Sequence, residues 1–212
     1  MEILIIIVLS FFAGGFLIAL AAGLWSRRKT LPCPAWLGWL VELDNPLLRN
    51  NRASVILSRL ELKEGMHVLD LGCGPGRVTI PLARAVGERG RVTAFDLQAG
   101  MLARVAEKAA AEGLANIEPV QGAAGEGLLG RERYDAAVMV TVLGEIPDQL
   151  GALREVCESL KPDGVLVVTE VIADPHFVAR EQVSALARAA GFEEDGFFGW
   201  RWDYSMRFRK EL

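Results

Sequence analysis

The chain has 212 residues, a length typical of one domain with a short additional segment. Its 23 basic and 27 acidic residues give a net charge of −4 at pH 7, which argues against nucleic acid as an obligatory partner. The three cysteines, Cys33, Cys73 and Cys157, are widely spaced, so the sequence predicts neither a disulfide framework nor a metal site.

Residues 3–25 carry no charged side chain. As a helix they would extend about 34 Å, which is enough to cross a bilayer core of about 30 Å. Trp25 stands at the boundary, and the basic residues Arg27, Arg28 and Lys29 follow it. This pattern predicts a single-pass membrane anchor whose N-terminus is outside and whose following domain faces the cytoplasm. A signal peptide and a buried core helix are the alternatives, although basic residues do not precede the run and core helices rarely lack charge for so long.

Residues 30–50 are predicted to link the anchor, residues 1–29, to a globular domain, residues 51–212. Within this linker, residues 35–43 have the pattern of a short amphipathic helix, because Trp36, Trp39 and Leu40 would share one face. That face either packs onto the globular domain or lies at the membrane interface, and the two interpretations are compatible.

From residue 46 onward, helix patterns alternate with short apolar runs typical of buried strands. The strands are predicted at 68–71, 91–95, 117–121, 134–141 and 165–170, and the helices at 46–62, 78–86, 99–112, 149–160 and 180–190. Apolar and polar residues then alternate with a period of two, which predicts a hairpin over 192–210. The expected fold is α/β: a doubly wound, mostly parallel seven-stranded sheet with a C-terminal antiparallel hairpin, preceded by one transmembrane helix.

The most specific motif is the glycine-rich turn after the strand at 68–71. Asp70 opens the pattern Asp-x-Gly-x-Gly-x-Gly, whose glycines are Gly72, Gly74 and Gly76. A dinucleotide-binding fingerprint would have its third glycine where this chain has Arg77, and the Lys-Ser/Thr pair of a P-loop does not follow. Such a turn brings a ligand against bare backbone at a helix N-terminus, and Asp70 would attract a cationic amine rather than a pyrophosphate.

Asp96 stands at the end of the next strand, where a carboxylate is well placed to accept hydrogen bonds from ribose hydroxyls. With both features, the chain resembles the class I S-adenosylmethionine-dependent methyltransferases, and most closely the members that methylate small molecules and lipids. The resemblance covers roughly residues 50–210 and rests on residues 68–76, 95–96, 120–122, 134–135 and 160–166.

This resemblance implies a site for S-adenosylmethionine at the ends of four strands. The implied cofactor-binding residues are Asp70, Gly72, Cys73, Gly74, Gly76, Asp96, Leu97, Met101, Ala123, Ala124, Thr141 and Val142. The glycines would approach the methionine part, Asp70 would hold its amino group, and Asp96 would take the ribose hydroxyls. Cys73 is expected to be a packed small residue and not a nucleophile.

The resemblance also implies how the adenine and the sulfonium are enclosed. Leu97 and Met101 would flank the adenine, and residues 141–142 would close over the methionine part and face the acceptor. Where the family often has Gly-Asp-Ala after the third strand, this chain has Gly-Ala-Ala at 122–124. The contact to the adenine amine is therefore missing or made by backbone, and Glu126 is a candidate substitute.

An amine or hydroxyl acceptor needs a group that takes its proton, whereas a thiolate needs little proton chemistry. The candidates near the carboxyl ends of the strands are Glu145, Asp148, Glu170, Asp174 and His176. Among these, Glu145 and His176 are the predicted catalytic residues, although any of the five could instead be a helix cap or a solvated loop group.

The sequence thus predicts a membrane-anchored methyltransferase that faces the cytoplasm. Its acceptor would be a small lipophilic or amphipathic molecule, such as a phospholipid amine, a quinone or a thiol. The alternatives are a methyltransferase of a soluble thiol, metalloid or protein acceptor, and a non-catalytic scaffold that binds the cofactor. The sequence makes no prediction of oligomeric state.

Overall fold

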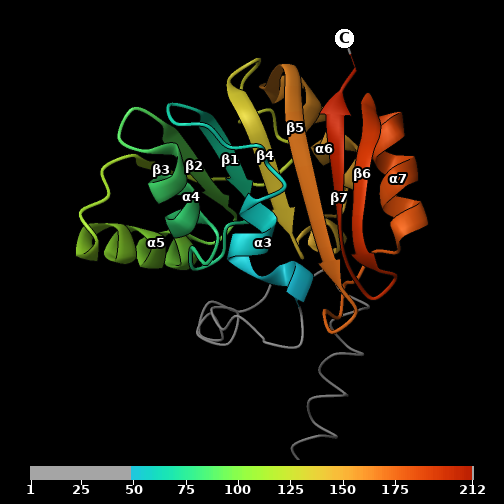
Figure 1. Cartoon of the computed structure of the whole chain (residues 1–212), viewed down its shortest axis with the longest axis horizontal. Coiled ribbons are helices and arrows are strands. Elements are labelled where there is room, and N and C mark those ends of the chain that lie inside the picture. The colour runs from blue at the N-terminus through green and yellow to red at the C-terminus, as the bar shows by residue number, and fades with distance from the viewer. Residues whose placement is uncertain (1–48, 212) are drawn as a thin grey trace, which may run out of the picture.

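The computed structural model of the chain describes residues 49–211 (Figure 1). The predicted anchor, residues 1–29, and the predicted amphipathic helix, residues 35–43, lie outside the described residues. Within residues 49–211, no helix combines the length and the apolar character needed to cross a membrane. The membrane anchor therefore stays a prediction from the sequence.

One seven-stranded sheet organises the domain, with the strand order β3-β2-β1-β4-β5-β7-β6. The strands are β1 (His67–Leu71), β2 (Arg91–Asp96), β3 (Ile117–Gln121), β4 (Tyr134–Val140), β5 (Leu160–Val171), β6 (Phe192–Trp200) and β7 (Asp203–Lys210). The first five strands pair in parallel, whereas β7 is antiparallel to both β5 and β6. The predicted doubly wound sheet with a C-terminal hairpin is confirmed, and the hairpin places its second strand against β5.

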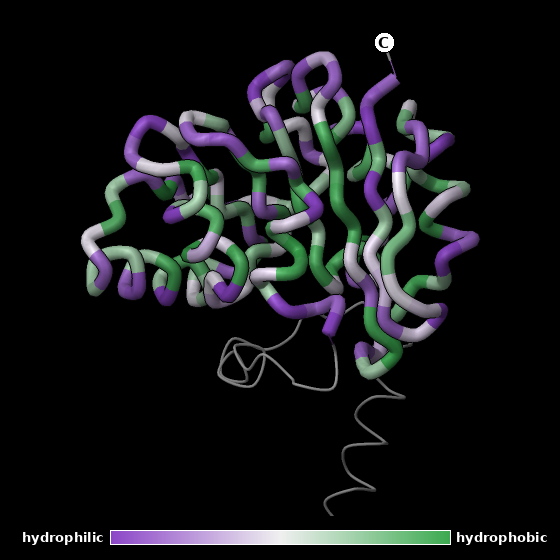
Figure 2. Tube along the Cα trace, viewed as in Figure 1, coloured by the Kyte–Doolittle hydropathy of each residue, from purple (hydrophilic) through white to green (hydrophobic). Residues whose placement is uncertain are grey.

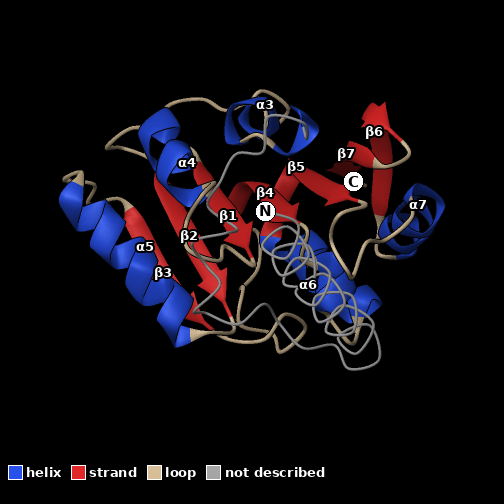
Figure 3. Ribbon diagram, turned by 90° about the horizontal axis from the view of Figure 1, so that it is seen from below, coloured by secondary structure: helices blue, strands red, loops and turns tan. Residues whose placement is uncertain are grey.

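Helices cover both faces of this sheet, as Figure 3 shows from the edge where the parallel strands end. They are α3 (Ala53–Leu57), α4 (Thr79–Val86), α5 (Ala99–Ala111), α6 (Gln149–Ser159) and α7 (Arg180–Ala189). Apolar residues of α3, α4 and α5 pack on one face, and those of α6 and α7 pack on the other. Because both faces are covered, the inner strands are nearly continuous hydrophobic runs, which Figure 2 shows along β5.

The prediction of a helix over residues 46–62 is wrong for most of residues 49–62, the part that the structure describes. The chain forms a 3-10 turn, η2 (Arg49–Asn51), and the short α3, separated by Arg52 in an extended conformation. The Asn50 backbone N–H and side-chain amide donate to Asp203, and Arg77 donates to the carbonyl and side-chain oxygens of Asn51. These tertiary contacts hold residues 49–52 out of a continuous helix, and the left-handed conformation of Glu61 (φ 53°) excludes a helix that runs through residue 61.

The strand predicted at 165–170 is longer than expected, since β5 begins at Leu160. Residues 161–164, expected to separate helix from strand, are part of the strand and carry an irregularity. The register with β4 shifts between Tyr134 and Ala136, and Asp163 is left-handed with φ 61°. A bulge of this kind absorbs the extra residues without breaking the strand. Every other predicted bound within the described residues agrees with the structure to within one residue.

Candidate active site

The glycine-rich turn between β1 and α4 is held against the end of β2. The backbone N–H groups of Gly72 and Cys73 both donate to the carbonyl of Phe95, at 2.8 and 3.1 Å. Gly72, Gly74 and Gly76 all have positive φ, which L-residues rarely adopt. The turn therefore stands at the carboxyl ends of the strands, the lower edge in Figure 1, where ligands bind in such sheets.

Two of these glycines differ in what surrounds them. A Cβ on Gly72 would lie 2.8 Å from the Cβ of Val142 and nearer still to one of its methyl groups. A Cβ on Gly74 would meet no atom within 4 Å. Val142 thus fills the space over Gly72, whereas the backbone at Gly74 is open to a ligand. The predicted role of Val142 over the methionine part of the cofactor remains a prediction.

Asp96 joins the turn to the end of β2. One carboxylate oxygen accepts the Gly74 N–H and the other accepts the Gln98 N–H, both at 2.9 Å. Burial raises the pKa of Asp96, and the two N–H donors partly oppose that rise. Each oxygen accepts one protein hydrogen bond and retains capacity for another, which is the acceptor arrangement that a pair of ribose hydroxyls requires.

Asp70 lies buried beneath the turn on the face covered by α4. Its carboxylate accepts the hydroxyl of Thr79 at 2.6 Å. Burial raises its pKa to about 6, opposed by the Thr79 hydrogen bond and the charge of Arg77 and reinforced by Asp96. At neutral pH Asp70 is therefore mainly ionised and can attract a cationic amine. Sequence reasoning missed Thr79 as its partner, although Thr79 follows Asp70 by only nine residues in the chain.

The residues predicted around the adenine are in different environments. Leu97 is 52% exposed, whereas Met101 is buried in the first turns of α5. Ala123 and Ala124 follow β3 and are half-buried. Glu126 bonds within this loop, because its carboxylate accepts the Ala123 N–H at 3.4 Å. Its predicted role as a substitute adenine contact remains a prediction.

Cys73 is buried against α5, and burial raises the pKa of its thiol further above its ordinary range. This supports the expectation of a packed residue, since the thiolate is the nucleophilic form. Thr141 directly follows β4. Its φ is 50°, and its backbone N–H donates to the carbonyl of Thr169. The left-handed conformation turns the chain sharply between β4 and η3 (Leu143–Glu145).

The two predicted catalytic residues come together from separate loops. Glu145 follows β4, His176 follows β5, and the imidazole Nδ1 lies 3.9 Å from the Glu145 carboxylate. Asp174 is 3.8 Å from the same nitrogen, and its carboxylate also accepts the His176 N–H at 2.6 Å. A Cβ on Gly144 would overlap the carbonyl of His176. That close approach of the two loops has no signal in the sequence beyond a glycine.

Glu170 lies beneath this group near the end of β5. Its Oε2 accepts the Val178 N–H at 3.2 Å, while its buried Oε1 has no hydrogen-bond partner among the described residues. Burial raises the pKa of Glu170 to about 8, and Asp174 and Glu145 add to the rise. A carboxyl group with this pKa is largely protonated at neutral pH.

The fifth candidate, Asp148, is a helix cap. Its side chain accepts the Gly151 N–H at 2.9 Å at the start of α6, which is the structural alternative that the sequence left open. Within residues 49–211, no group of His, Cys, Asp and Glu side chains is arranged to hold a metal ion.

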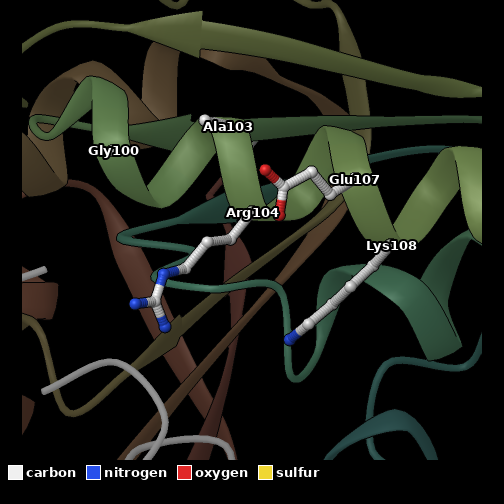
Figure 4. Close-up of a pocket in the computed structure, with 5 residues that line it drawn as sticks. All are labelled: Gly100, Ala103, Arg104, Glu107 and Lys108. Atoms are coloured by element: carbon white, nitrogen blue, oxygen red, sulfur yellow. The ribbon is translucent and has the colours of Figure 1, made fainter. Parts of the chain in front are cut away.

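A depression of about 480 Å³ lies along α5, where Figure 4 shows its lining residues. These are Gly100, Ala103, Arg104, Glu107 and Lys108. None of them is a predicted cofactor or catalytic residue, although Lys108 donates to the carbonyl of Pro75 in the glycine turn. The depression therefore borders the turn from the side of α5.

Three kinds of comparison agree with this arrangement. A family model described as a methyltransferase domain matches residues 62–197. Demethylmenaquinone methyltransferase from Staphylococcus aureus (strain MRSA252) is 34% identical over 131 residues, which are 62% of this chain and 53% of that protein. The enzyme of the same name from Shouchella clausii (strain KSM-K16) is 34% identical over 114 residues, 54% of this chain and 48% of that protein. The chain thus spans about half the length of these relatives.

Among solved structures, a SAM-dependent methyltransferase from Aquifex aeolicus has a similar fold. It superposes with a TM-score of 0.74 at 23% identity, over 84% of this chain and 98% of that one. Identity at this level shows the shared fold alone.

The sheet order and the glycine turn agree with the class I methyltransferase fold predicted from the sequence, and the acids at the ends of β1 and β2 lie beside that turn, where the cofactor site is predicted. The chain belongs to the methyltransferase domain family, whose model covers more than half of it. The family, the enzyme class and the cofactor predicted from the sequence are confirmed at this level. The roles assigned to individual site residues remain predictions.

The residues present fit the cofactor by their chemistry. Asp70 is an anion for a cationic amino group, Asp96 has acceptors left for vicinal hydroxyls, and Gly74 leaves its backbone uncovered. These three features lie close together, at the ends of the adjacent strands β1 and β2.

Proposed function

We propose that this protein transfers a methyl group from S-adenosylmethionine to a small lipophilic acceptor of the quinone type. The observation that carries the cofactor part is the Asp96 carboxylate, which bridges the open Gly74 backbone and the start of α5. The acceptor part is supported by two relatives named demethylmenaquinone methyltransferase, each 34% identical over the matched part of this chain.

The proposed site divides the cofactor between two strand ends. Asp70 pairs with its amino group, the backbone of the glycine turn contacts its methionine part, and Asp96 accepts both ribose hydroxyls. When bound, S-adenosylmethionine supplies a methyl group on a sulfonium, which is an excellent leaving group. Positioning of the acceptor can therefore contribute most of the rate acceleration.

Methylation of a ring carbon in a reduced quinone releases one proton for each methyl group transferred. Loss of a hydroxyl proton makes the neighbouring carbon more nucleophilic, so a base beside the acceptor assists the reaction. We assign this role to the pair of Glu145 and His176: the imidazole takes the proton, and the carboxylates of Glu145 and Asp174, each within 4 Å of Nδ1, stabilise the resulting cation.

A lipophilic acceptor located in the bilayer is consistent with the membrane anchor predicted from residues 3–25. A lipophilic quinone dissolves in the bilayer, and an enzyme attached there meets it at high local concentration. We therefore propose a single-pass membrane protein whose methyltransferase domain faces the cytoplasm. The charge-free run and the basic residues at 27–29 support this location.

The test is methyl transfer by the full chain in proteoliposomes. Labelled S-adenosylmethionine is supplied with vesicles that contain either a demethylated naphthoquinol or an amine phospholipid, and the labelled product is identified. We expect label in the quinol alone. Label in the phospholipid alone would overturn the acceptor, and no heat on titration with S-adenosylhomocysteine would overturn the cofactor site.

The catalytic pair is tested with Glu145→Gln and His176→Gln. Both should lower kcat by about 10²-fold or more, as is usual for loss of a general base, while cofactor affinity stays unchanged. Asp148→Asn is the matched control, since Asp148 is an acid of the same loop that caps α6. Equal activity in all three variants would exclude the pair from proton transfer.

A further inference from the structure

Exposed apolar side chains gather at the carboxyl edge of β5 and β6. Among residues 49–211, five large apolar side chains are exposed, and three of them lie here: Ile172 at 46%, Trp200 at 77% and Trp202 at 50%. The Ile172 N–H donates to the Trp202 carbonyl at 2.7 Å, so the loop after β5 and the β6–β7 turn are one surface. With Arg201, we name these residues the aromatic tip.

The composition of this tip is typical of a membrane interface. Tryptophan rings favour the headgroup region, where the ring is half in hydrocarbon, and a neighbouring cation favours anionic lipid. The Arg201 guanidinium lies 4.2 Å from the centre of the Trp202 ring, so cation and aromatic face are presented together. Figure 2 shows hydrophobic colouring again in the loop that follows β5 at this lower edge.

The point where the preceding chain joins the domain lies beside the tip. Asn50 donates its backbone N–H to the Asp203 carboxylate at 3.2 Å, and its side-chain amide donates to the Asp203 carbonyl at 3.0 Å. Asp203 pairs with Trp200 and directly follows Trp202. The linker that comes from the charge-free run thus reaches the domain at the edge that carries the exposed tryptophans.

The proposed acceptor site is at the same edge. Val171 ends β5, Ile172 belongs to the tip, and Asp174 and His176, whose side chains lie together in the proposed acceptor site, follow within the next four residues. A domain seated on this tip would hold the Glu145–His176 pair close to the bilayer surface, where a lipophilic acceptor emerges.

We propose that the aromatic tip is a second membrane contact, in which Trp200 and Trp202 enter the headgroup layer and turn the active-site edge toward the bilayer. It rests on the proposed attachment through residues 3–25, but it concerns the orientation of the domain and not the attachment itself. The occupant of this surface is lipid, and the exposed Arg201 favours an anionic leaflet.

The first test is tryptophan quenching in the full chain. The variant Trp25→Phe/Trp36→Phe/Trp39→Phe leaves Trp200 and Trp202 as the only tryptophans of the five. In proteoliposomes, we expect lipids brominated near the headgroup to quench this emission and aqueous acrylamide to quench it weakly. Full quenching by acrylamide with no effect of brominated lipid overturns the proposed membrane contact of the tip. The proposal is also overturned if brominated lipid has no effect and the two tryptophans are protected from acrylamide in detergent as well, because self-association of the protein then explains the protection.

Flotation of the same sample separates this proposal from the anchor. Protein that floats without bromolipid quenching has the anchor and lacks the tip contact. Protein that fails to float lacks the anchor, and bromolipid quenching with added vesicles then reports on the tip alone.

The second test is functional. Trp200→Ser/Trp202→Ser should raise the KM for a vesicle-borne acceptor by about fivefold or more, because the domain loses its interfacial contact. Affinity for S-adenosylhomocysteine should be unchanged, which also shows that the variant folds. Leu128→Ser is the matched control, because Leu128 is 48% exposed beside Gly122 at the far end of the sheet. An unchanged KM in the tryptophan variant, or an equal rise in the control, overturns the proposal.

Discussion

The contact between Gly72 and Val142 predicts that two neighbouring glycines respond very differently to the same substitution. In Gly72→Ala the new Cβ falls 2.8 Å from the Val142 Cβ and 3.1 Å from Cγ1, at a backbone φ of 71°. In Gly74→Ala the φ is 51°, yet no atom lies within 4 Å of the new group. Both variants suffer left-handed strain, and only the first is overpacked.

The magnitudes follow from these two contributions. The left-handed conformation costs about 1–2 kcal/mol for an L-residue, and overpacking a filled space costs about 1–3 kcal/mol more. We therefore expect the free energy of unfolding to fall by about 2–5 kcal/mol in Gly72→Ala and by about 1–2 kcal/mol in Gly74→Ala. Affinity for the cofactor should fall more in Gly74→Ala than in Gly72→Ala, because a methyl group on Gly74 would occupy the open space that we assign to the ligand.

The assay is urea unfolding of the full chain in mild detergent, followed by circular dichroism, with S-adenosylhomocysteine titration in parallel. Gly72→Ala/Val142→Ala completes a double-mutant cycle, since the smaller side chain vacates the space that the new Cβ needs. The double variant should recover most of the overpacking contribution. Equal stability of the two single glycine variants, or no recovery in the double variant, would refute the steric argument.

Three further predictions concern acids in or near the site. Because the pKa of Asp70 is about 6, affinity for S-adenosylhomocysteine should rise between about pH 5 and pH 7 as the carboxylate ionises, and Asp70→Asn should flatten that profile in calorimetry. The raised pKa of Glu170, about 8, means that the folded state holds a proton that the unfolded state has lost, so unfolding free energy should fall as the pH rises from about 5 to 8. Glu170→Gln should weaken that dependence in urea titrations at several pH values, and an identical slope would contradict the assignment. Asp148→Ala removes the acceptor of the Gly151 N–H and should cost about 1 kcal/mol of stability without changing cofactor affinity.

The sequence predicted the parallel half of the sheet well because β1, β2 and β4 are largely buried apolar runs between clear helix stops. It failed in the segment before β1, where the apolar spacing of 46–62 suits a helix but tertiary contacts decide the conformation. Asn50 is held by Asp203, which is 153 residues away in the chain. A pattern within one segment contains no information about such a partner.

The candidate site was predictable to the extent that it depends on motifs. Asp70 and Asp96 stand at strand ends, and the parallel register brings those ends together. The pairing of Glu145 with His176 depends instead on how two irregular loops fold, and Gly144 permits it by leaving room for the His176 carbonyl. The burial of Glu170 was equally hidden, since an acid in a strand does not reveal which face it occupies until the sheet is assembled.

The antiparallel course of β7 has a practical consequence for handling the protein. Lys210 pairs with Phe192 at the start of β6, and its ammonium donates to the Leu160 carbonyl at the start of β5. The described chain therefore leaves the domain at the edge opposite the glycine turn, as Figure 1 shows at the end marked C. An affinity tag or fluorescent protein fused after residue 212 would project away from the cofactor site and the aromatic tip, so it could report on the enzyme without obstructing either.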